Sequence, residues 1–237
     1  YEANRCLEII SKMFNLAEVW GLRPDGSNPC RHVPKYREKK RERFLSQQEL
    51  QRLGRVLCEA EQDGTESPFI IAGFRLLILT GCRLGEIQTL KWTYIKPRHI
   101  ELPDSKVGAR RIPLPQAAQD VLDALPRQSD NPYIIAGKLA GSYATDFQRP
   151  WRRIRARAEL PNTRIHDLRH TYASMAVSGG MPIQMVGRLL GHSQLQTTMR
   201  YAHLADEPVL EAAQHNAETL SGLIAPVLTQ PRFRLIS

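Results

Sequence analysis

The longest apolar stretch of the chain, FIIAGFRLLILTGC, is the feature that most limits how it can fold. At 14 residues it is too short to span a bilayer as a helix, and it carries the charged Arg75 in its interior. Other parts of the chain must therefore bury it, so we expect a globular domain built around a helix over residues 67–79 that Gly81 interrupts. The start of the sequence has no signal-peptide pattern, and the four cysteines form no CxxC pair. Both features are typical of a soluble cytoplasmic protein with reduced thiols.

The rest of the pattern is mostly helical. Apolar residues near a 3.6-residue spacing predict an amphipathic helix over residues 1–21, and Ser46 with Glu49 forms a capping box ahead of another helix. Two β-type runs, TYIKPRHIELP and RRIPLP, flank a turn containing Asp, Ser and Gly and predict a small hairpin. The expected fold class is mainly α with a small antiparallel β-sheet (α+β). Further helices are predicted over residues 116–125, 142–159, 166–178, 182–190, 194–201 and 206–222.

The order of these elements predicts four segments. Prolines, a glycine and Asn or Asp residues in RPDGSNPCRHVP end the first helix and lead into a basic run. The sequence begins with Tyr1 rather than Met, so we expect a fragment or a processed piece of a longer protein. The segments are a helical part, a basic linker, a main domain and a C-terminal tail, over residues 1–30, 31–44, 45–222 and 223–237.

A formal net charge of +9 and a pI near 9.6 favour a polyanionic partner. The positive charge is concentrated in RHVPKYREKKRER, with seven Lys and Arg against two Glu, and in WRRIRAR, with four arginines. Either run alone could be a solvated face, but the two together favour contacts with nucleic-acid phosphates. The candidate DNA-contacting residues are Arg31, Lys35, Arg37, Lys39, Lys40, Arg41, Arg110, Arg111, Arg152 and Arg153, where Arg110 and Arg111 are either phosphate contacts or solvated.

A second group of polar side chains lies at the ends of the predicted elements. Arginines suit the binding of a phosphate because the planar guanidinium grips two oxygens and stays protonated. Histidine and lysine move protons near neutral pH, and a tyrosine hydroxyl can attack phosphorus to give a covalent intermediate. No DxD-type carboxylate cluster is present, which disfavours a metal-dependent nuclease and predicts a site without metal or cofactor. The residues of this group are Arg83, Glu86, Lys106, His166, Arg169, His192 and Tyr201.

Four motifs carry a resemblance to a known family. LTGCRLGEIQTLKW, SKVGARRIPL, HDLRHTYAS and VGRLLGHSQLQTTMRYAHL look like the successive catalytic boxes of the tyrosine recombinase (phage integrase) family, in the family's order and spacing. The resemblance covers roughly residues 46–205 and implies the fold of that family's catalytic domain. The preceding helix and linker resemble the end of the family's core-binding domain and its connector to the catalytic domain.

The resemblance also implies a role for each residue of the group. Arg83 and Arg169 would clamp the scissile phosphate, and Tyr201 would attack it to form a 3′-phosphotyrosyl link and free a 5′-hydroxyl. Lys106 would be the general acid on the leaving 5′-oxygen. His166 would accept a proton or bind the phosphate, and His192 would donate a hydrogen bond to it. Two further residues would support the site without touching the phosphate. Glu86 would hold the first arginine, Arg83, and the catalytic histidine, and His170 would be either a structural residue or a support for its catalytic neighbours.

The function implied is a metal- and ATP-independent site-specific DNA recombinase, either the integrase of a mobile element, which the linker and the basic balance favour, or a Xer-like resolvase. Its expected partner is double-stranded DNA in the nucleoid, bound by a tetramer on paired sites, with DNA-bending accessory proteins as further partners. Apolar residues in the tail, residues 223–237, would pack either on a neighbouring protomer or back on their own domain.

Other interpretations of the same residues stay open at this point. His166 and His170 have the i,i+4 spacing of a zinc pair on a helix, although the Glu of HExxH and a third ligand are missing. Residues 182–201 could form a helix-turn-helix of a non-catalytic DNA-binding regulator. A type IB topoisomerase would share the chemistry. Tyr172 is the nearest competitor of Tyr201, but it is expected to face the core with Leu168 and Met175.

Overall fold

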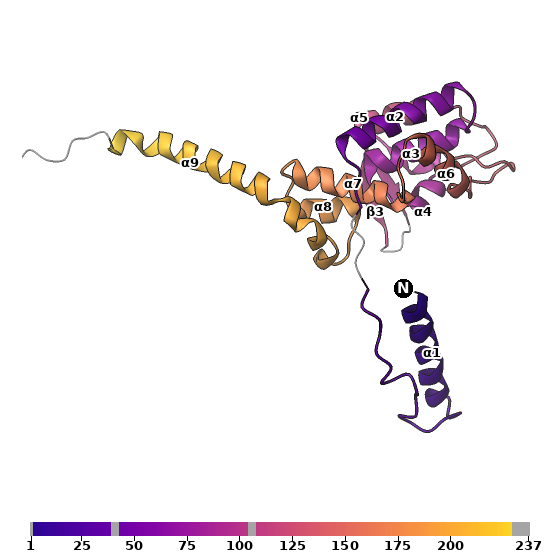
Figure 1. Cartoon of the computed structure of the whole chain (residues 1–237). Helices are drawn as coiled ribbons and strands as arrows, with labels where there is room; N and C mark the ends of the chain where they lie inside the picture. Colours follow the sequence, from indigo (N-terminus) through magenta and orange to yellow (C-terminus); the bar gives the residue numbers. More distant parts are fainter. Residues whose placement is uncertain (1, 39–42, 104–107, 229–237) are drawn as a thin grey trace, which may run out of the picture. The chain divides into compact units, whose positions relative to one another are not determined.

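The computed structural model of the chain describes residues 2–38, 43–103 and 108–228, without the side chains of residues 206, 207, 222 and 224–228. Lys39, Lys40, Arg41 and Lys106 therefore lie outside the described residues. The chain divides into two compact units, Tyr1–Glu42 and Arg43–Ser237. Figure 1 gives the order of their elements.

The first unit is a helix with a segment that returns along it. Helix α1 spans Glu2–Val19, as the apolar spacing predicted. Asn28 donates to the carbonyl of Ser11 and to Asn15 Oδ1, at 3.1 and 2.7 Å. Further along, Asn4 exchanges two hydrogen bonds with the backbone of Tyr36, each 2.8 Å long. Buried amide side chains thus fix the extended start of the basic run to α1.

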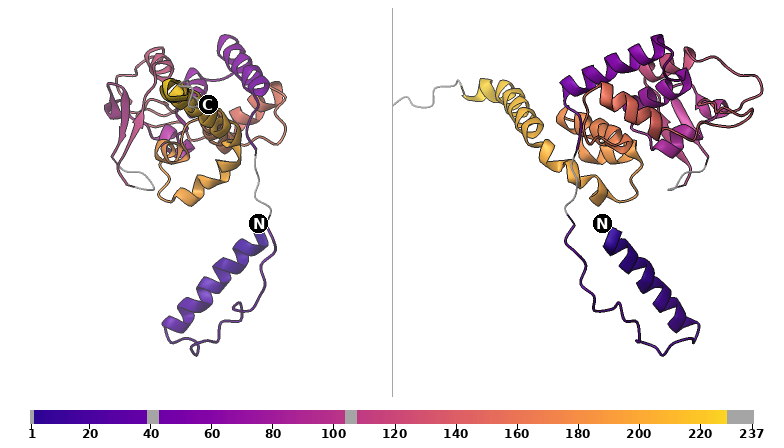
Figure 2. Two further views of the ribbon diagram at one scale, coloured as in Figure 1. Left: turned by 90° about the vertical axis from the view of Figure 1, so that its left-hand side faces the viewer. Right: turned by 45° about the vertical axis from the view of Figure 1, so that its right-hand side comes forward.

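The second unit is built around α3, Pro68–Thr80, which is the predicted apolar helix. It contacts α2 (Gln47–Gln62), α4 (Leu84–Gln88), α5 (Gln116–Asp123) and α7 (Ile165–Ser178), as Figures 1 and 2 show. Its residues Ile71, Phe74 and Leu76 are fully buried. The predicted capping box at the start of α2 is confirmed, since Ser46 Oγ accepts from Glu49 N and the Glu49 carboxylate accepts from Ser46 N.

The sheet has three antiparallel strands in the order β1-β2-β3: Ile95–Lys96, His99–Leu102 and Arg110–Pro113. The predicted hairpin is the β2–β3 pair, in which Ile100 lies opposite Ile112. The sequence pattern predicted a single strand-like run, TYIKPRHIELP, where the structure has the two strands β1 and β2. A tight turn separates them because Arg98 adopts a left-handed conformation with φ of 69°.

Two predicted helices differ from the structure. Helix α6 spans Gln148–Arg157 rather than residues 142–159, because Asp146 Oδ1 accepts hydrogen bonds from the amides of Gln148 and Arg149 and so starts the helix there. Residues 194–201 do not form an α-helix. They contain the 3-10 turn η2 (Leu195–Thr197) and the first part of a second one, η3 (Met199–Leu204).

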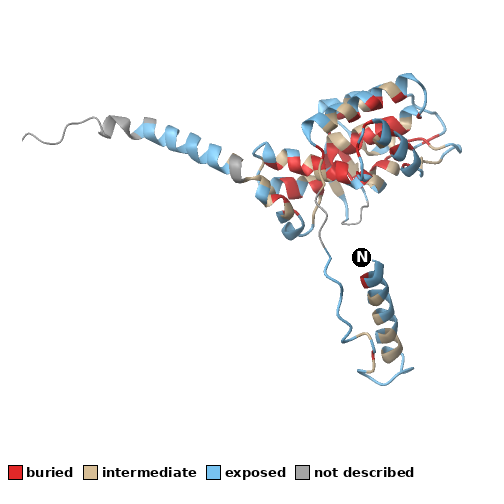
Figure 3. Cartoon of the chain, viewed as in Figure 1, coloured by how far each residue is buried: buried red, intermediate tan, exposed pale blue. Residues whose placement is uncertain are grey.

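The remaining helices are α8 (Ile183–Leu190) and α9 (Asp206–Leu228). Helix α9 continues past residue 222, where the sequence placed the start of a broken tail, and its described side chains Val209, Leu210, Leu220 and Leu223 are exposed (Figure 3). The tail beyond Leu228 lies outside the described residues.

Aromatic packing fixes where α7 begins. The Phe74 ring lies 5.3 Å from the rings of both Phe147 and Trp151, and the indole of Trp151 donates to the carbonyl of Thr163 at 2.9 Å. Because Thr163 lies two residues before the first residue of α7, this hydrogen bond ties the start of α7 to the core. Leu168 faces that core as expected, but Met175 is 50% exposed, so its predicted core position is wrong.

The fold class is confirmed as mainly α with a small antiparallel sheet. None of the described helices is long and apolar enough to cross a membrane.

A glycine at the end of α3 provides a stability test. Gly81 has φ of +63°, and a Cβ there would lie 2.5 Å from the Tyr172 ring. We expect Gly81→Ala to lower the free energy of unfolding by roughly 2–4 kcal/mol, because it adds left-handed strain to a steric clash. The matched control is Gly85→Ala in α4, where a Cβ meets open space. Urea denaturation of both variants should show a lower midpoint for Gly81→Ala only, and equal midpoints would contradict this account.

Candidate active site

Three arginines hold the C-terminal end of α8. Arg110 Nη2 donates to the carbonyl of Leu189, Arg169 Nη2 to that of Leu190 at 2.6 Å, and Arg83 Nη2 to that of Gly191 at 3.1 Å. These three consecutive carbonyls lie at the negative end of the helix dipole, where cations are favoured. The arginines come from the α3–α4 junction, β3 and α7, so one short segment of backbone joins three distant parts of the chain.

Glycines make these close approaches possible. Gly191 ends α8 in the left-handed conformation, and a Cβ on it would lie 2.5 Å from Arg110 Nε. Gly81 ends α3 in the same conformation, and its carbonyl accepts from Arg169 Nη1 at 2.5 Å. Gly191 thus lets the Arg110 guanidinium pack directly against backbone, whereas a side chain at Gly81 would meet the Tyr172 ring.

Glu86 is the carboxylate that faces this group. It accepts from Arg83 Nη1 at 2.8 Å and from Arg110 Nη1 at 3.0 Å, and it also caps α4 through the amide of Arg83. The Glu86 and Arg110 side chains are buried, at 9 and 6% exposure, whereas the Arg83 side chain is 26% exposed. One carboxylate among three guanidinium groups leaves the site with an excess of positive charge.

Burial and this excess of positive charge together lower the pKa of Arg169 and of His192. Burial and the neighbouring Arg83 and Arg110 lower the pKa of Arg169 to about 10, so Arg169 remains protonated at neutral pH. Burial, together with Arg169 and Arg83, lowers the pKa of His192 to about 4, and that histidine is therefore neutral. An anion entering the site would relieve the repulsion between these groups.

Tyr201 lies buried beside two histidines of α7. Its hydroxyl group and His170 Nδ1 are in hydrogen-bond contact, and the His166 and His170 rings meet edge to face with centroids 4.7 Å apart. Burial is the main cause that lowers the pKa of His166, and it lowers that of His170 to about 4. His192 completes the group, since its Nδ1 lies 2.8 Å from the hydroxyl oxygen of Thr198 in the segment that leads to Tyr201.

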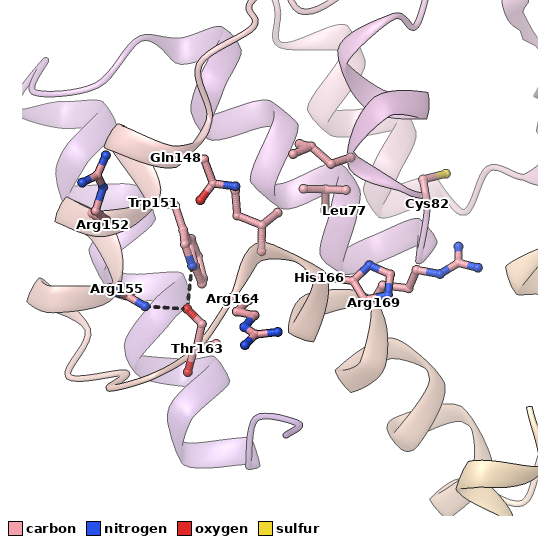
Figure 4. Close-up of a pocket in the computed structure, with 12 residues that line it drawn as sticks. Leu77, Cys82, Gln148, Trp151, Arg152, Arg155, Thr163, Arg164, His166 and Arg169 are labelled. Carbon is pink, nitrogen blue, oxygen red and sulfur yellow. Dashed lines mark hydrogen bonds between the residues drawn. The ribbon is translucent and has the colours of Figure 1, made fainter. Parts of the chain in front are cut away.

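A cavity of about 490 Å³ opens on one side of the group, between α6 and the start of α7. His166 and Arg169 line it from α7, and Arg152 and Arg155 line it from α6 (Figure 4). Arg155 and the indole of Trp151 both donate to the carbonyl of Thr163. The cavity is therefore rich in cationic groups and has a wall fixed by the core.

The structure brings together five of the six predicted catalytic residues: Arg83, His166, Arg169, His192 and Tyr201. The sixth, Lys106, lies outside the described residues. Glu86 contacts Arg83 as expected. His170 is more than a distant support, since it touches the hydroxyl group of Tyr201.

The predicted DNA-contacting residues divide into two groups. Arg110 does not belong with them, because its side chain is buried against Glu86 and the end of α8. Alternation along β3 could have revealed this, since Arg110 shares the face of the buried Ile112. The described residues that remain exposed are Arg31, Lys35, Arg37, Arg111, Arg152 and Arg153.

Some of the exposed positive charges are already paired. Lys35 lies 2.7 Å from Glu8, Arg111 3.1 Å from Glu101, and Arg153 2.6 Å from Glu66. The Lys35 and Arg111 pairs are exposed and contribute little to stability, so an incoming phosphate can compete for these two cations. Arg153 is held more firmly, because it donates to both carboxylate oxygens of buried Glu66.

Two alternative interpretations lose their basis. Residues 182–201 hold one α-helix followed by 3-10 turns, so they do not form a helix-turn-helix. Among the described residues, no three His, Cys, Asp or Glu side chains are grouped to hold a metal ion, which leaves the zinc pair without a third ligand.

Comparison with known proteins places the chain in a family. The Phage integrase family profile matches residues 43–208. The integrase of Haemophilus phage HP1 is 30% identical over 80% of this chain and 52% of its own length. The tyrosine recombinase XerD of Brucella suis is also 30% identical, over 86% of this chain and 72% of its own. The chain therefore belongs to the phage integrase family, and it spans about half the length of the HP1 protein.

Solved structures agree on the fold. The catalytic domain of bacteriophage HP1 integrase is 28% identical and aligns with a TM-score of 0.56, over 74% of this chain and 96% of that one. A lambda integrase dimer bound to a core site aligns with a TM-score of 0.66 at 20% identity, over 82% of this chain and 57% of that one. The second unit thus has the expected fold of a tyrosine recombinase catalytic domain.

The neighbouring residues Arg110 and Arg111 allow a matched test of the buried arginine. We expect Arg110→Met to lower the free energy of unfolding by roughly 2–4 kcal/mol, because it leaves buried Glu86 with one partner fewer and the Leu189 carbonyl without its donor. Arg111→Met, whose side chain is 78% exposed, should change it by less than about 0.5 kcal/mol. Chemical denaturation measures both, and equal effects would contradict the interior role of Arg110.

The neutral histidines predict how stability depends on pH. In the unfolded chain a histidine binds a proton below about pH 6.5. In the folded domain His170 and His192 do so only near pH 4, so the unfolded state binds more protons between these values. The free energy of unfolding should therefore fall as the pH is lowered from 6.5 towards 4. Urea denaturation at several pH values tests this, and the slope should decrease in His170→Gln but persist in a His203→Gln control, whose histidine is exposed.

Proposed function

We propose that this protein is a site-specific DNA recombinase that cuts and rejoins DNA through a covalent link between Tyr201 and a 3′-phosphate. The observation that carries the proposal is the excess positive charge of Arg83, Arg110 and Arg169 around the carboxylate of Glu86, with Tyr201 and three histidines beside it. A phosphodiester supplies the missing negative charge. The family membership of the chain supports the same chemistry.

Each residue has a role consistent with its position. Arg83 and Arg169 clamp the scissile phosphate, while Arg110 stays behind them and holds the end of α8. His192 follows that end directly, so the arginine grip also sets where His192 points. His166 lines the cavity and binds the phosphate or accepts a proton. Lys106 as the general acid on the 5′-oxygen remains a prediction from the sequence.

The expected contributions are large enough to make the roles measurable. An arginine on a phosphoryl transition state is worth on the order of 10³–10⁵ in rate, and a general acid or base about 10²–10⁴. The phosphotyrosyl link keeps the energy of the broken bond, so rejoining uses no ATP. Metal ions have no assigned part, because arginines supply the positive charge at the phosphate.

The partner in this proposal is double-stranded DNA of the nucleoid, bound by a tetramer on paired sites with help from DNA-bending proteins. The exposed basic residues of the run 31–38 and Arg152, which lines the cavity, are the proposed phosphate contacts. The lambda integrase dimer, a solved neighbour of this chain, is bound to a core DNA site. We favour the integrase of a mobile element over a Xer-like resolvase because Lys and Arg outnumber Asp and Glu in the chain, which gives it a net charge of +9.

Formation of a covalent adduct tests the proposal. The protein is incubated, without added metal, with nicked DNA duplexes. Their sequences are those of the two ends of the genetic element that carries the gene for this chain. The products are separated on a denaturing gel. We expect a shifted band that protease removes. Tyr201→Phe should abolish it, because no other hydroxyl replaces the nucleophile.

The matched control is Tyr172→Phe, which removes the hydroxyl group of the half-buried tyrosine that packs over Gly81. This variant should form the adduct at close to the wild-type rate. An adduct that survives in Tyr201→Phe, or binding of these duplexes without any adduct, would overturn the assignment of Tyr201.

A further inference from the structure

The proposed reaction requires that Tyr201 lose a proton. A tyrosine hydroxyl group has a reference pKa near 10, so almost none of it is ionised at neutral pH. Attack on phosphorus therefore needs a group that accepts the proton as the new bond forms. That acceptor must reach the phenolic oxygen without occupying the place of the phosphate.

His170 meets the geometric requirement. Its Nδ1 is in hydrogen-bond contact with the Tyr201 hydroxyl group, across 31 residues of sequence. The two rings lie 6.0 Å apart, and the contact is formed between α7 and η3, which pack against each other. The contact therefore belongs to the packing of the domain and does not depend on a loop.

The surroundings of His170 keep its ring neutral in the free protein. Burial is the main cause that lowers its pKa to about 4, and the neighbouring His166, Arg200, Arg169 and His192 lower it further. At neutral pH the ring is therefore uncharged and has one nitrogen with a free electron pair. A bound phosphodiester places a negative charge in the same site and so raises the affinity of His170 for a proton.

We propose that His170 is the proton acceptor for Tyr201 in strand cleavage and the proton donor to the same oxygen in rejoining. This inference rests on the proposed recombinase function. In cleavage, the O–H bond of Tyr201 breaks and its proton passes to Nδ1 of His170, while the phenolic oxygen bonds to phosphorus. The bond from phosphorus to the 5′-oxygen breaks, and the general acid protonates that oxygen. In rejoining, a 5′-hydroxyl group attacks phosphorus and gives its proton to the deprotonated general acid. The bond from phosphorus to the Tyr201 oxygen breaks, and His170 returns its proton to that oxygen.

His166 is the other histidine that could take this part. It lies one helical turn before His170, with its ring 4.7 Å away, and it lines the cationic cavity together with Arg169. That position suits a phosphate ligand. Within the motif HDLRH, His166 then binds the phosphate and His170 exchanges the proton of Tyr201.

A substrate with sulfur in place of the bridging 5′-oxygen isolates the proton acceptor, because its thiolate leaves without a general acid. The full chain is mixed with nicked duplexes that carry this sulfur atom and have the end sequences of the genetic element that carries its gene. Adduct formation is followed in a single turnover between pH 5.5 and 9. We expect His170→Gln, which keeps a hydrogen-bonding side chain but binds no proton, to slow the adduct by roughly 10²–10⁴ at pH 7. Its rate should then rise with pH, as hydroxide replaces the missing base.

A second variant separates proton transfer from positioning. His170→Ala leaves space at Nδ1, and added imidazole should restore part of its rate, whereas imidazole should have no effect on the wild type. The matched control is His203→Gln, an exposed histidine two residues after Tyr201, which should cleave at the wild-type rate. Thermal unfolding and gel-shift affinity identify any variant that fails to fold or bind.

The possible results distinguish the two proposals. If folded His170→Gln cleaves as fast as the wild type, or if His170→Ala cleaves faster because the histidine only restrains Tyr201, the assignment of His170 is overturned while the recombinase function stands. A slow His170→Ala variant that imidazole does not rescue would make His170 a positioning residue and also overturn the assignment. Absence of any adduct with the wild type would overturn the recombinase function together with it.

Discussion

The grip of three guanidinium groups on the last carbonyls of α8 is the interaction on which the site depends. Arg83, Arg110 and Arg169 come from segments that are up to 86 residues apart, and each donates to one of three consecutive carbonyls. The helix dipole makes this end of α8 attractive to cations, which offsets part of the repulsion among the arginines. The same donors therefore assemble the domain and hold its positive charge in one place.

This arrangement explains why the site tolerates so much charge at low exposure. Glu86 neutralises one guanidinium, and backbone carbonyls solvate the others in place of water. The positive charge that remains makes the binding of an anion favourable at this site. Because that preference is built into buried hydrogen bonds, binding of a phosphate does not have to order the arginines first, and the entropy cost of binding is reduced.

The sequence predicted which residues gather at the candidate site better than it predicted their surroundings. Arg83, Arg169, His192 and Tyr201 stand in motifs, and the apolar run that became α3 needed only its length and hydrophobicity. Arg110 was misplaced because a charged residue next to Arg111 suggested a surface pair, whereas period-2 alternation from Ile112 places it inside. The contact of His170 with Tyr201 joins residues 31 positions apart, so it depends on how η3 packs on α7 and has no signal in either segment alone.

The charge of the site also connects DNA binding to chemistry. Without DNA, burial and the arginines keep His170 and His192 neutral, so a proton on either is costly. A phosphodiester offsets part of this positive charge just where Tyr201 must give up its proton. Proton transfer to His170 is therefore unfavourable in the free protein and becomes easier only when a phosphate lies between the arginines. Under the proposed function, a buried tyrosine held by a neutral histidine is therefore a poor nucleophile until a phosphodiester binds, and this limits cleavage to bound DNA.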